Sequence, residues 1–361
     1  MKRLADLFRN VLEAFAVGDA LGMPTEFMTR DAIRTRFGLV DRLLNPANDS
    51  QNHPDLAQGQ VTDDTEQVLA LLDEYRIKGR VDASDTAYRL LRWMRESGAI
   101  EKRYIGPSSR AALEAVERGE DPATTGMRGT TCGGIMRVPA AVLYWLSKRE
   151  AQKPGSPDST DPAADDSFQE AVIACCLPTH NTQPALEAAM GYAWALRQAL
   201  ERSLDPDCTP FASLPPVDLF AAASAGASEG RLRAPYATCA PSLASRLSLL
   251  ESIPALMESP DALLDFLFDV YGTGLESVDV ATAAVSIARF CGGDAWLAIR
   301  MGASAGGDTD TIAALAGALC AAQSGQHEIP AAILAEVMSV NALDLPSIAF
   351  ALAGQPAAAR D

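Results

Sequence analysis

Two short clusters of aspartate and threonine are the residues in this chain whose types and spacing could do chemistry. Thr62-Asp63-Asp64-Thr65 lies near the start of the chain, and Asp308-Thr309-Asp310-Thr311 lies near its end. Carboxylates and hydroxyls are hard oxygen ligands, and several of them converging are what Mg²⁺ or Mn²⁺ requires. We therefore interpret the chain as a hydrolase with a site for two metal ions, provided that the two clusters meet in space.

Helix capping is the alternative explanation for either cluster, because each one precedes an apolar helical run. An Asp or Thr at an N-cap accepts a hydrogen bond from a backbone N–H and suits the positive end of the helix dipole. A cap needs one carboxylate, whereas each cluster brings two and contains no Lys or Arg. Packing all of these carboxylates into one site would raise their pKa values and cost stability unless a cation compensated for their charge. Capping is the better explanation for one cluster alone, and metal binding is the better one if they converge.

The elements that position these clusters are expected to be helices throughout. Aromatic residues make up only 6% of the 361 residues, and the apolar content is carried by Ala and Leu, which favour helices over strands. No convincing run of alternating β-branched residues occurs, so we predict an all-α fold. Because clusters from both ends must converge, residues 1–361 are treated as a single domain. Apolar residues at helical spacing occur at 4–15, 83–96, 109–118, 138–148, 168–176, 183–204, 217–227, 243–250, 261–268, 278–290, 295–303, 311–322 and 331–339.

Three segments between these runs differ in composition. The first predicted helix runs into Gly18-Asp19-Ala20-Leu21-Gly22, where glycines allow another backbone to come close. Residues 36–60 form a long polar loop that leads directly to the first acidic cluster, and loops of this kind often carry function. Residues 151–167 are rich in Pro, Ser and Asp, which predicts a flexible surface insertion.

Charge and composition exclude several classes of protein. A formal net charge of -17 argues against a broad nucleic-acid surface, although a phosphorylated ligand could still bind locally. The odd number of cysteines, without a CxxC motif, predicts reduced thiols in a cytosolic protein. No segment approaches the ~20 apolar residues of a membrane helix, and charged residues interrupt the first apolar run. We therefore expect a soluble cytoplasmic protein that does not contact a membrane.

Three motifs together resemble the signatures of the ADP-ribosylglycohydrolase family, in that family's order and at about its spacing. They are Gly18-Asp19-Ala20-Leu21-Gly22-Met23-Pro24-Thr25-Glu26, Thr62-Asp63-Asp64-Thr65 and Gly306-Gly307-Asp308-Thr309-Asp310-Thr311-Ile312-Ala313. The resemblance covers nearly the whole chain, and the last motif is the most specific. Further matches are Gly106-Pro107-Ser108-Ser109, Gly133-Gly134-Ile135-Met136-Arg137, Thr179-His180 and Tyr271-Gly272-Thr273-Gly274.

The resemblance implies a compact orthogonal helical bundle with a centre of two Mg²⁺ or Mn²⁺ ions that cleaves the bond at the anomeric carbon of ADP-ribose. Glu26 falls at the family's acidic residue beside the metals, so Glu26, Asp63 and Asp310 are the expected catalytic residues. Taken alone, Glu26 would be read as a surface carboxylate after a proline turn. The metal ligands implied by the resemblance are Thr62, Asp63, Asp64, Asp308, Asp310 and Thr311.

A second set of residues is expected to bind the substrate. The glycine-rich stretch 129–134 precedes a helical run and could present N–H groups to a diphosphate, although such a stretch is more often only a turn. The family usually has Asn where this chain has Cys132, which leaves the specificity of the pocket open. Arg137 is equally a helix-start residue bonded to local carbonyls or a ligand contact. His180 is equally a cap-region residue or a neighbour of the distal ribose, and His53 and His327 receive no role. The resemblance implies substrate contacts at Gly106, Ser108, Gly133, Gly134 and His180.

Three functions are compatible with these residues. The leading prediction is a hydrolase that cleaves the N- or O-glycosidic bond of an ADP-ribose adduct and so reverses a modification on a protein. The second keeps the metals but acts on a small ADP-ribose ester or a nucleoside-like N-glycoside. The third is a non-enzymatic, crystallin-like member of the family. The expected partner is accordingly an ADP-ribosylated protein or a small ADP-ribose conjugate, and the sequence carries no signal for an oligomeric state.

Overall fold

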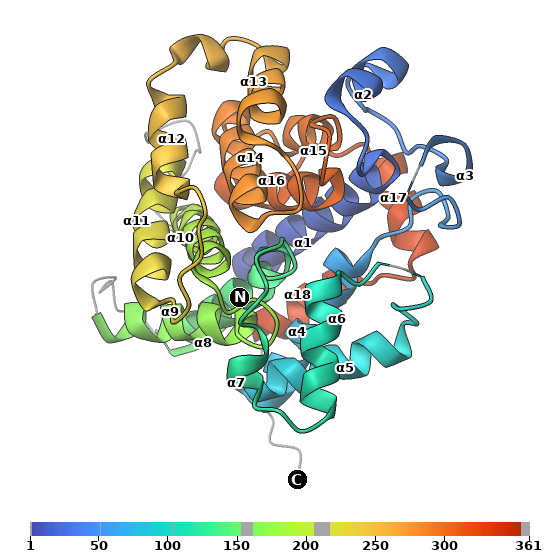
Figure 1. The fold of residues 1–361 in the computed structure, drawn as a ribbon. Coiled ribbons are helices and arrows are strands. Elements are labelled where there is room, and N and C mark those ends of the chain that lie inside the picture. Colours follow the sequence, from blue (N-terminus) through green and yellow to red (C-terminus); the bar gives the residue numbers. More distant parts are fainter. Residues whose placement is uncertain (1, 51, 103, 153–161, 206–216, 355–361) are drawn as a thin grey trace.

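The computed structural model describes residues 2–50, 52–102, 104–152, 162–205 and 217–354, and in this part of the chain the fold is all-α (Figure 1). The predicted fold class is therefore confirmed. Helices in the first half are α1 (Lys2–Gly22), α2 (Arg30–Phe37), α3 (Pro46–Asp49), α4 (Asp63–Lys78), α5 (Ala83–Glu96), α6 (Pro107–Glu117), α7 (Pro122–Thr125), α8 (Val138–Gln152) and α9 (Pro162–Cys176). Helices in the second half are α10 (Gln183–Leu204), α11 (Leu219–Arg233), α12 (Leu243–Glu251), α13 (Pro260–Phe266), α14 (Ser277–Cys291), α15 (Ala295–Ala303), α16 (Thr309–Ser324), α17 (Ala331–Val340) and α18 (Leu345–Gly354).

The pairing of α1 with α16 brings the two ends of the chain together at the centre of the bundle. A Cβ atom on Gly18 would lie 2.5 Å from the Ala313 carbonyl oxygen, and one on Gly22 would lie 2.4 Å from that of Thr309. Both glycines are therefore required for the close approach of the two backbones, as the sequence predicted. The C-terminal end of α1 and the N-terminal end of α16 consequently lie side by side.

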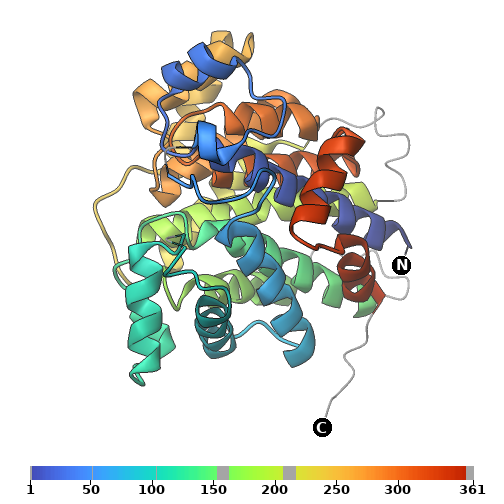
Figure 2. The same cartoon turned by 90° about the vertical axis from the view of Figure 1, so that its right-hand side faces the viewer.

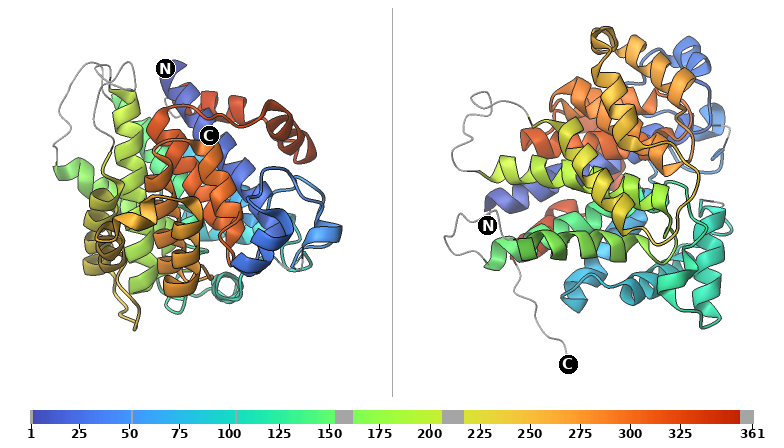
Figure 3. Two further views of the ribbon diagram at one scale, coloured as in Figure 1. Left: turned by 90° about the horizontal axis from the view of Figure 1, so that it is seen from above. Right: turned by 60° about the vertical axis from the view of Figure 1, so that its left-hand side comes forward.

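Outer helices enclose this central pair. The 22-residue α10 packs against α11, α14 and α16, while α4 packs against α5 and α8. Helices α17 and α18 pack against α1 on another side of the bundle, and they are bent by 85° relative to each other (Figures 2 and 3). The buried apolar side chains of these helices form one continuous core.

Several segments differ from the sequence prediction. Helix α2 ends only at Phe37 and α3 occupies Pro46–Asp49, so the predicted loop at 36–60 contains part of one helix and all of another. Helix α9 begins at Pro162 and includes residues 162–167 of the predicted insertion, while 153–161 lie outside the described residues. Helix α18 was not predicted. Its apolar residues lack the alternation with polar residues that marks an amphipathic helix.

No single helix among the described residues is long and apolar enough to cross a membrane. One sharply bent pair, α17 with α18, passes that test by length and composition only.

Candidate metal centre and substrate pocket

A single pocket of about 310 Å³ brings both acidic clusters together. Asp63 and Asp64 reach it from the start of α4, whereas Asp308, Asp310 and Thr311 reach it from the start of α16. The condition on which metal binding depended is therefore met. Other residues that line the pocket are Glu26, Phe27, Asn52, His53, Tyr104, Ile105, Gly106, Pro107, Ser109, Thr131, Cys132, Gly133, Met136 and Leu275.

Asp19 of α1 shapes the start of α4. Its fully buried carboxylate accepts hydrogen bonds from the Thr62 N–H at 3.0 Å, the Thr65 N–H at 3.1 Å and the Thr65 hydroxyl at 2.6 Å. Thr62 is the N-cap, and its hydroxyl oxygen accepts from the Asp64 N–H at 3.3 Å. Capping is thus performed by Thr62 and Asp19, which leaves Asp63 and Asp64 for another role. This role of Asp19 was not predicted, although a carboxylate within an apolar stretch of α1 was a signal.

The start of α16 has a different construction. Asp308 occupies the N-cap position, yet its side chain makes no capping hydrogen bond. The backbone before it is fixed by Gly306 and Gly307, whose φ values of 80° and 75° favour glycine. Gly307 also exchanges backbone hydrogen bonds with Phe27 and Met28 at 2.7 and 3.0 Å, which holds the segment after Glu26 against the second cluster.

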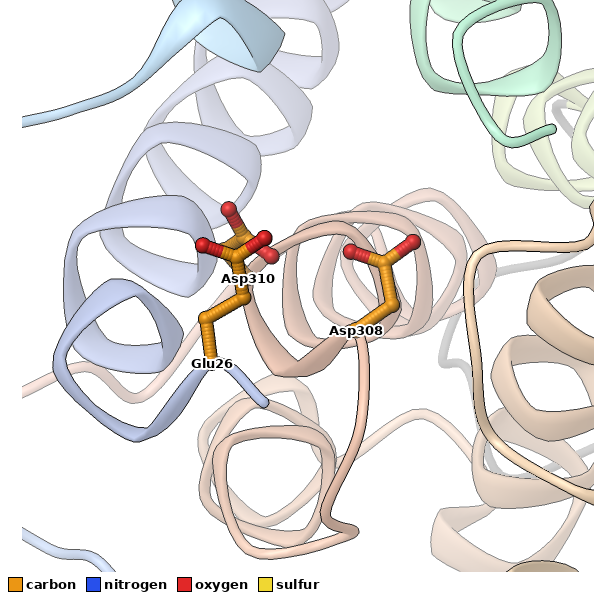
Figure 4. A group of neighbouring side chains, drawn as sticks. All are labelled: Glu26, Asp308 and Asp310. Carbon is orange, nitrogen blue, oxygen red and sulfur yellow. The ribbon is translucent and has the colours of Figure 1, made fainter. Parts of the chain in front are cut away.

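Three carboxylate oxygens in this pocket are buried and have no hydrogen-bond partner among the residues that the structure describes. They are Oδ2 of Asp64, Oδ2 of Asp308 and Oδ1 of Asp310. Glu26, Asp308 and Asp310 each place one oxygen so that the three lie within 4.8 Å of one another, and Figure 4 shows their carboxylates turned into the same space. Within the described ranges, no Lys or Arg forms an ion pair with them. Converging oxygens that lack a donor fit one or more divalent cations.

The protonation of these groups supports the same conclusion. Burial raises the pKa of Asp63, Asp64 and Asp310 well above the ordinary value, and neighbouring carboxylates raise each further. Burial and Glu26 also raise the pKa of Asp308, to about 6. Without a cation the cluster therefore holds protons that a nearby positive charge would displace.

Glu26 is buried, so the alternative of a surface carboxylate is wrong. It follows the 3₁₀ turn η1 (Met23–Thr25) at the end of α1. One of its oxygens, Oε2, lies 2.6 Å from Asn52 Nδ2 and 2.7 Å from His53 Nε2. Neither contact was predicted, because nothing local in the sequence links Asn52 or His53 to Glu26.

The expected substrate contacts divide into two groups. Gly106 and Gly133 line the pocket, whereas Ser108 does not and its neighbour Ser109 does. Gly134 and His180 lie outside the lining, and Cβ atoms on Gly133 and Gly134 would come within 2.7 and 2.8 Å of the His180 side chain. His180 is fully buried behind this glycine turn, so its contact with a distal ribose stays a prediction.

Hydrogen bonds explain why His180 stays behind the turn. Its Nε2 lies 3.0 Å from the Thr131 hydroxyl and its Nδ1 lies 2.7 Å from the Thr179 hydroxyl. Burial lowers the pKa of His180 well below its ordinary value, and the nearby Arg137 lowers it further, which keeps the ring neutral.

Arg137 is fully buried and ties three segments together. It donates to the Cys175 carbonyl at 3.1 Å, to the Gln67 side chain at 3.2 Å and to the Thr179 hydroxyl. These partners are distant in sequence, so Arg137 is not a helix-start residue bonded to local carbonyls. It is also absent from the pocket lining. Arg137 instead fixes α4 relative to the segment that carries His180.

Known proteins resemble this chain in sequence and in fold. The model of the family described as ADP-ribosylglycohydrolase matches residues 1–359. The chain is 30% identical over 341 residues to the uncharacterized protein YegU of Escherichia coli (strain K12), covering 94% of this chain and 93% of YegU. It is 30% identical over 149 residues to the ADP-ribosylarginine hydrolase Tri1 of Pseudomonas putida (strain GB-1), covering 38% of this chain and 36% of Tri1. A solved structure described as an ADP-ribosylglycohydrolase-related protein complex shares the fold, with a TM-score of 0.64 at 24% identity over 98% of this chain and 99% of that chain. The chain belongs to the ADP-ribosylglycohydrolase family.

Proposed function

We propose that this protein is a metal-dependent hydrolase that cleaves the glycosidic bond of ADP-ribose adducts, and that its substrate is an ADP-ribosylated protein. The observation that carries this proposal is the carboxylate of Asp308, which does not cap its helix. It stands at the N-cap of a 16-residue helix, makes no capping bond and leaves a buried oxygen beside the unpartnered oxygens of Asp64 and Asp310. Capping explains none of these three oxygens, whereas a pair of divalent cations would satisfy all of them.

The residues that would hold the two ions are those implied by the family resemblance. Asp63 and Asp64 line the pocket on one side, and Asp308, Asp310 and Thr311 line it on the other, while Thr62 is not part of the lining. When bound, such ions supply Lewis-acid polarisation of oxygen atoms and orient a water molecule near the anomeric carbon. Glu26 would accept a proton from that water, because it is the pocket carboxylate that lies outside both helix-start clusters.

Backbone N–H groups would meet the diphosphate. Helix α6 begins in the pocket lining with Gly106 at its N-cap and without a side-chain cap. Because Pro107 has no N–H, the backbone N–H of the lining residue Ser109 is the one that would donate to an anion. Cys132 stands where the family usually has Asn. Burial and the nearby Asp308 raise the pKa of its thiol well above the ordinary value, so the thiol stays protonated and can donate to that carboxylate.

One observation favours the second candidate, a nucleoside-like N-glycoside without phosphate. No Lys or Arg lines the pocket among the residues that the structure describes. A diphosphate would then depend on the cations and on the α6 N-terminus for its neutralisation. The non-enzymatic candidate has less support, because no expected metal ligand is missing.

A substrate panel separates these candidates. We expect Arg-linked ADP-ribose on a protein to be hydrolysed with Mg²⁺ or Mn²⁺, since Tri1 is named for this linkage, and Ser-linked and acetyl-linked ADP-ribose should be compared beside it. Asp308→Asn should abolish turnover. The matched control is Asp294→Asn, because Asp294 is an N-cap aspartate outside the pocket that does cap, accepting from the Leu297 N–H at 2.8 Å.

Hydrolysis of a nucleoside without hydrolysis of any ADP-ribose conjugate would favour the second candidate. Failure to hydrolyse every substrate, by a protein shown to have bound its metal, would contradict an enzymatic function.

A further inference from the structure

Asn52 and His53 form a pair of donors on one oxygen of Glu26. The distances to Glu26 Oε2 are 2.6 Å from Asn52 Nδ2 and 2.7 Å from His53 Nε2. All three side chains line the pocket, and the His53 side chain is only 6% exposed. None of the three belongs to the acidic clusters at the starts of α4 and α16.

The position of one proton follows from these contacts. A carboxylate oxygen accepts hydrogen bonds, so we assign the proton of the 2.7 Å contact to His53 Nε2. With that proton on Nε2, the 2.9 Å separation of Asn52 Nδ2 and His53 Nε2 is a contact between two donors to the same acceptor and not a hydrogen bond. Since no described residue donates to the other oxygen, Oε1 is the one left for a water molecule or a cation.

The loop that carries this pair is itself fixed. The His53 N–H donates to the Ser50 hydroxyl at 2.8 Å. Further along, Asn341 at the end of α17 accepts from the Val61 N–H at 3.0 Å and donates to the Gly59 carbonyl at 2.8 Å. The residue after Val61 is Thr62, the N-cap of α4. One anchored segment thus reaches both Glu26 and the first acidic cluster.

We propose that Asn52 and His53 are positioning residues that hold Glu26 Oε2 and so direct Oε1 toward the reacting water. The inference rests on the proposed function for its kinetic consequence. Two hydrogen bonds on one oxygen restrict rotation of the carboxylate, and a base that rotates freely is correctly oriented for a smaller fraction of the time. Loss of the pair should therefore lower kcat, while KM changes little, because the substrate contacts remain.

The kinetic test compares two replacements of the same residue. His53→Phe keeps a planar ring without the donor, and we expect kcat to fall by about 10–100-fold with KM nearly unchanged. His53→Gln places an amide N–H₂ near the position of Nε2, and it should recover most of the lost rate. Equal kcat values for His53→Phe and the wild type, or a His53→Gln variant as slow as His53→Phe, would overturn the positioning role.

His327→Phe is the matched control. His327 Nε2 also lies 2.7 Å from a buried carboxylate, Glu13, but this pair lies outside the pocket lining. The control should lower the melting temperature to a similar extent as His53→Phe and leave kcat unchanged. If both variants lowered kcat equally, the effect would be one of general stability and the inference would fail.

A spectroscopic test does not depend on turnover, so it separates failure of this inference from failure of the proposed function. The chain has only three histidines, which makes long-range proton–nitrogen NMR spectra of the imidazole rings assignable. We expect His53 to be protonated at Nε2, and Glu26→Ala to shift its nitrogen resonances while those of His180 and His327 stay in place. A His53 ring with an unprotonated Nε2, or one insensitive to Glu26→Ala, would contradict the contact.

Discussion

The starts of α4 and α16 carry similar residues but are built differently. At α4 the N-cap hydroxyl of Thr62 and the buried carboxylate of Asp19 accept the backbone N–H groups, so Asp63 and Asp64 are not needed as caps. At α16 the N-cap residue is itself an aspartate, and its side chain makes no capping bond. At a helix start, therefore, a carboxylate that makes no capping hydrogen bond is a candidate metal ligand.

The largest expected effect is on the carboxylate that belongs to neither helix start. Glu26→Gln should lower the single-turnover rate by about 10²–10⁴-fold, the range for a positioned acid or base, because the amide cannot accept the proton of the attacking water. Affinity for ADP-ribose should fall far less, since Gln keeps the size of the side chain. Both quantities should be measured at saturating Mg²⁺. A variant that turns over at the wild-type rate would remove Glu26 from the reaction.

Metal removal should come next, because the proposed function has both helix starts binding the same ions. Bound metal stabilises the folded state by about 2.7 kcal/mol at a free concentration of 100 Kd, so a chelator should lower the melting temperature. Asp310→Ala should abolish most of this difference, which calorimetry with and without chelator would show. Identical melting curves, for a preparation shown to contain metal, would mean that the carboxylates do not bind ions.

A third prediction separates capping from ligation directly. Asp19→Ala leaves buried donors of Thr62 and Thr65 without a partner, which costs about 1–3 kcal/mol of unfolding free energy. Asp308→Asn removes no capping bond and relieves a buried charge, so the metal-free variant should be at least as stable as the wild type. Denaturant unfolding of both variants without metal provides the measurement. Equal destabilisation by the two changes would erase the distinction between the helix starts.

A further expected effect is a pH dependence of the metal-free protein. The pKa of Asp308 is raised from 3.8 to about 6, so the folded state binds more protons than the unfolded state between these values. Protonated Asp308 therefore contributes to the free energy of unfolding at low pH. This contribution is lost as the pH rises from about 4 to about 6. We expect the wild type and Asp308→Asn to melt alike near pH 4, and the wild type to melt at a lower temperature near pH 7. A difference in melting temperature between the two proteins that stays constant or shrinks with rising pH would contradict the raised pKa of Asp308.

Much of the fold could be predicted from helical spacing. Helices α5, α10 and α15 have the predicted bounds, because their apolar residues recur at the helical period and their ends carry turn residues. Helix α18 escaped prediction because it is apolar on nearly every side. The boundary of α9 was missed because the Pro, Ser and Asp before it also suit a helix N-terminus.

The candidate site was predictable only in part. The acidic clusters could be recognised from their residue types and from their place before helices. Asp19, Asn52 and His53 did not, because each acts through a hydrogen bond to a residue at least 26 positions away. His180 is fixed in the same way, since the glycines that cover it lie far from it in the sequence.

Anomalous diffraction from crystals soaked in Mn²⁺ would show directly whether the starts of α4 and α16 share one metal centre. We expect two peaks in the pocket, roughly 3.5–4 Å apart, with oxygens from both Asp63-Asp64 and Asp308-Asp310 as ligands. Asp308→Asn crystals should lose at least one of the peaks. A pocket without Mn²⁺ at saturating concentration, with Asp308 turned to cap α16, would contradict a shared metal centre.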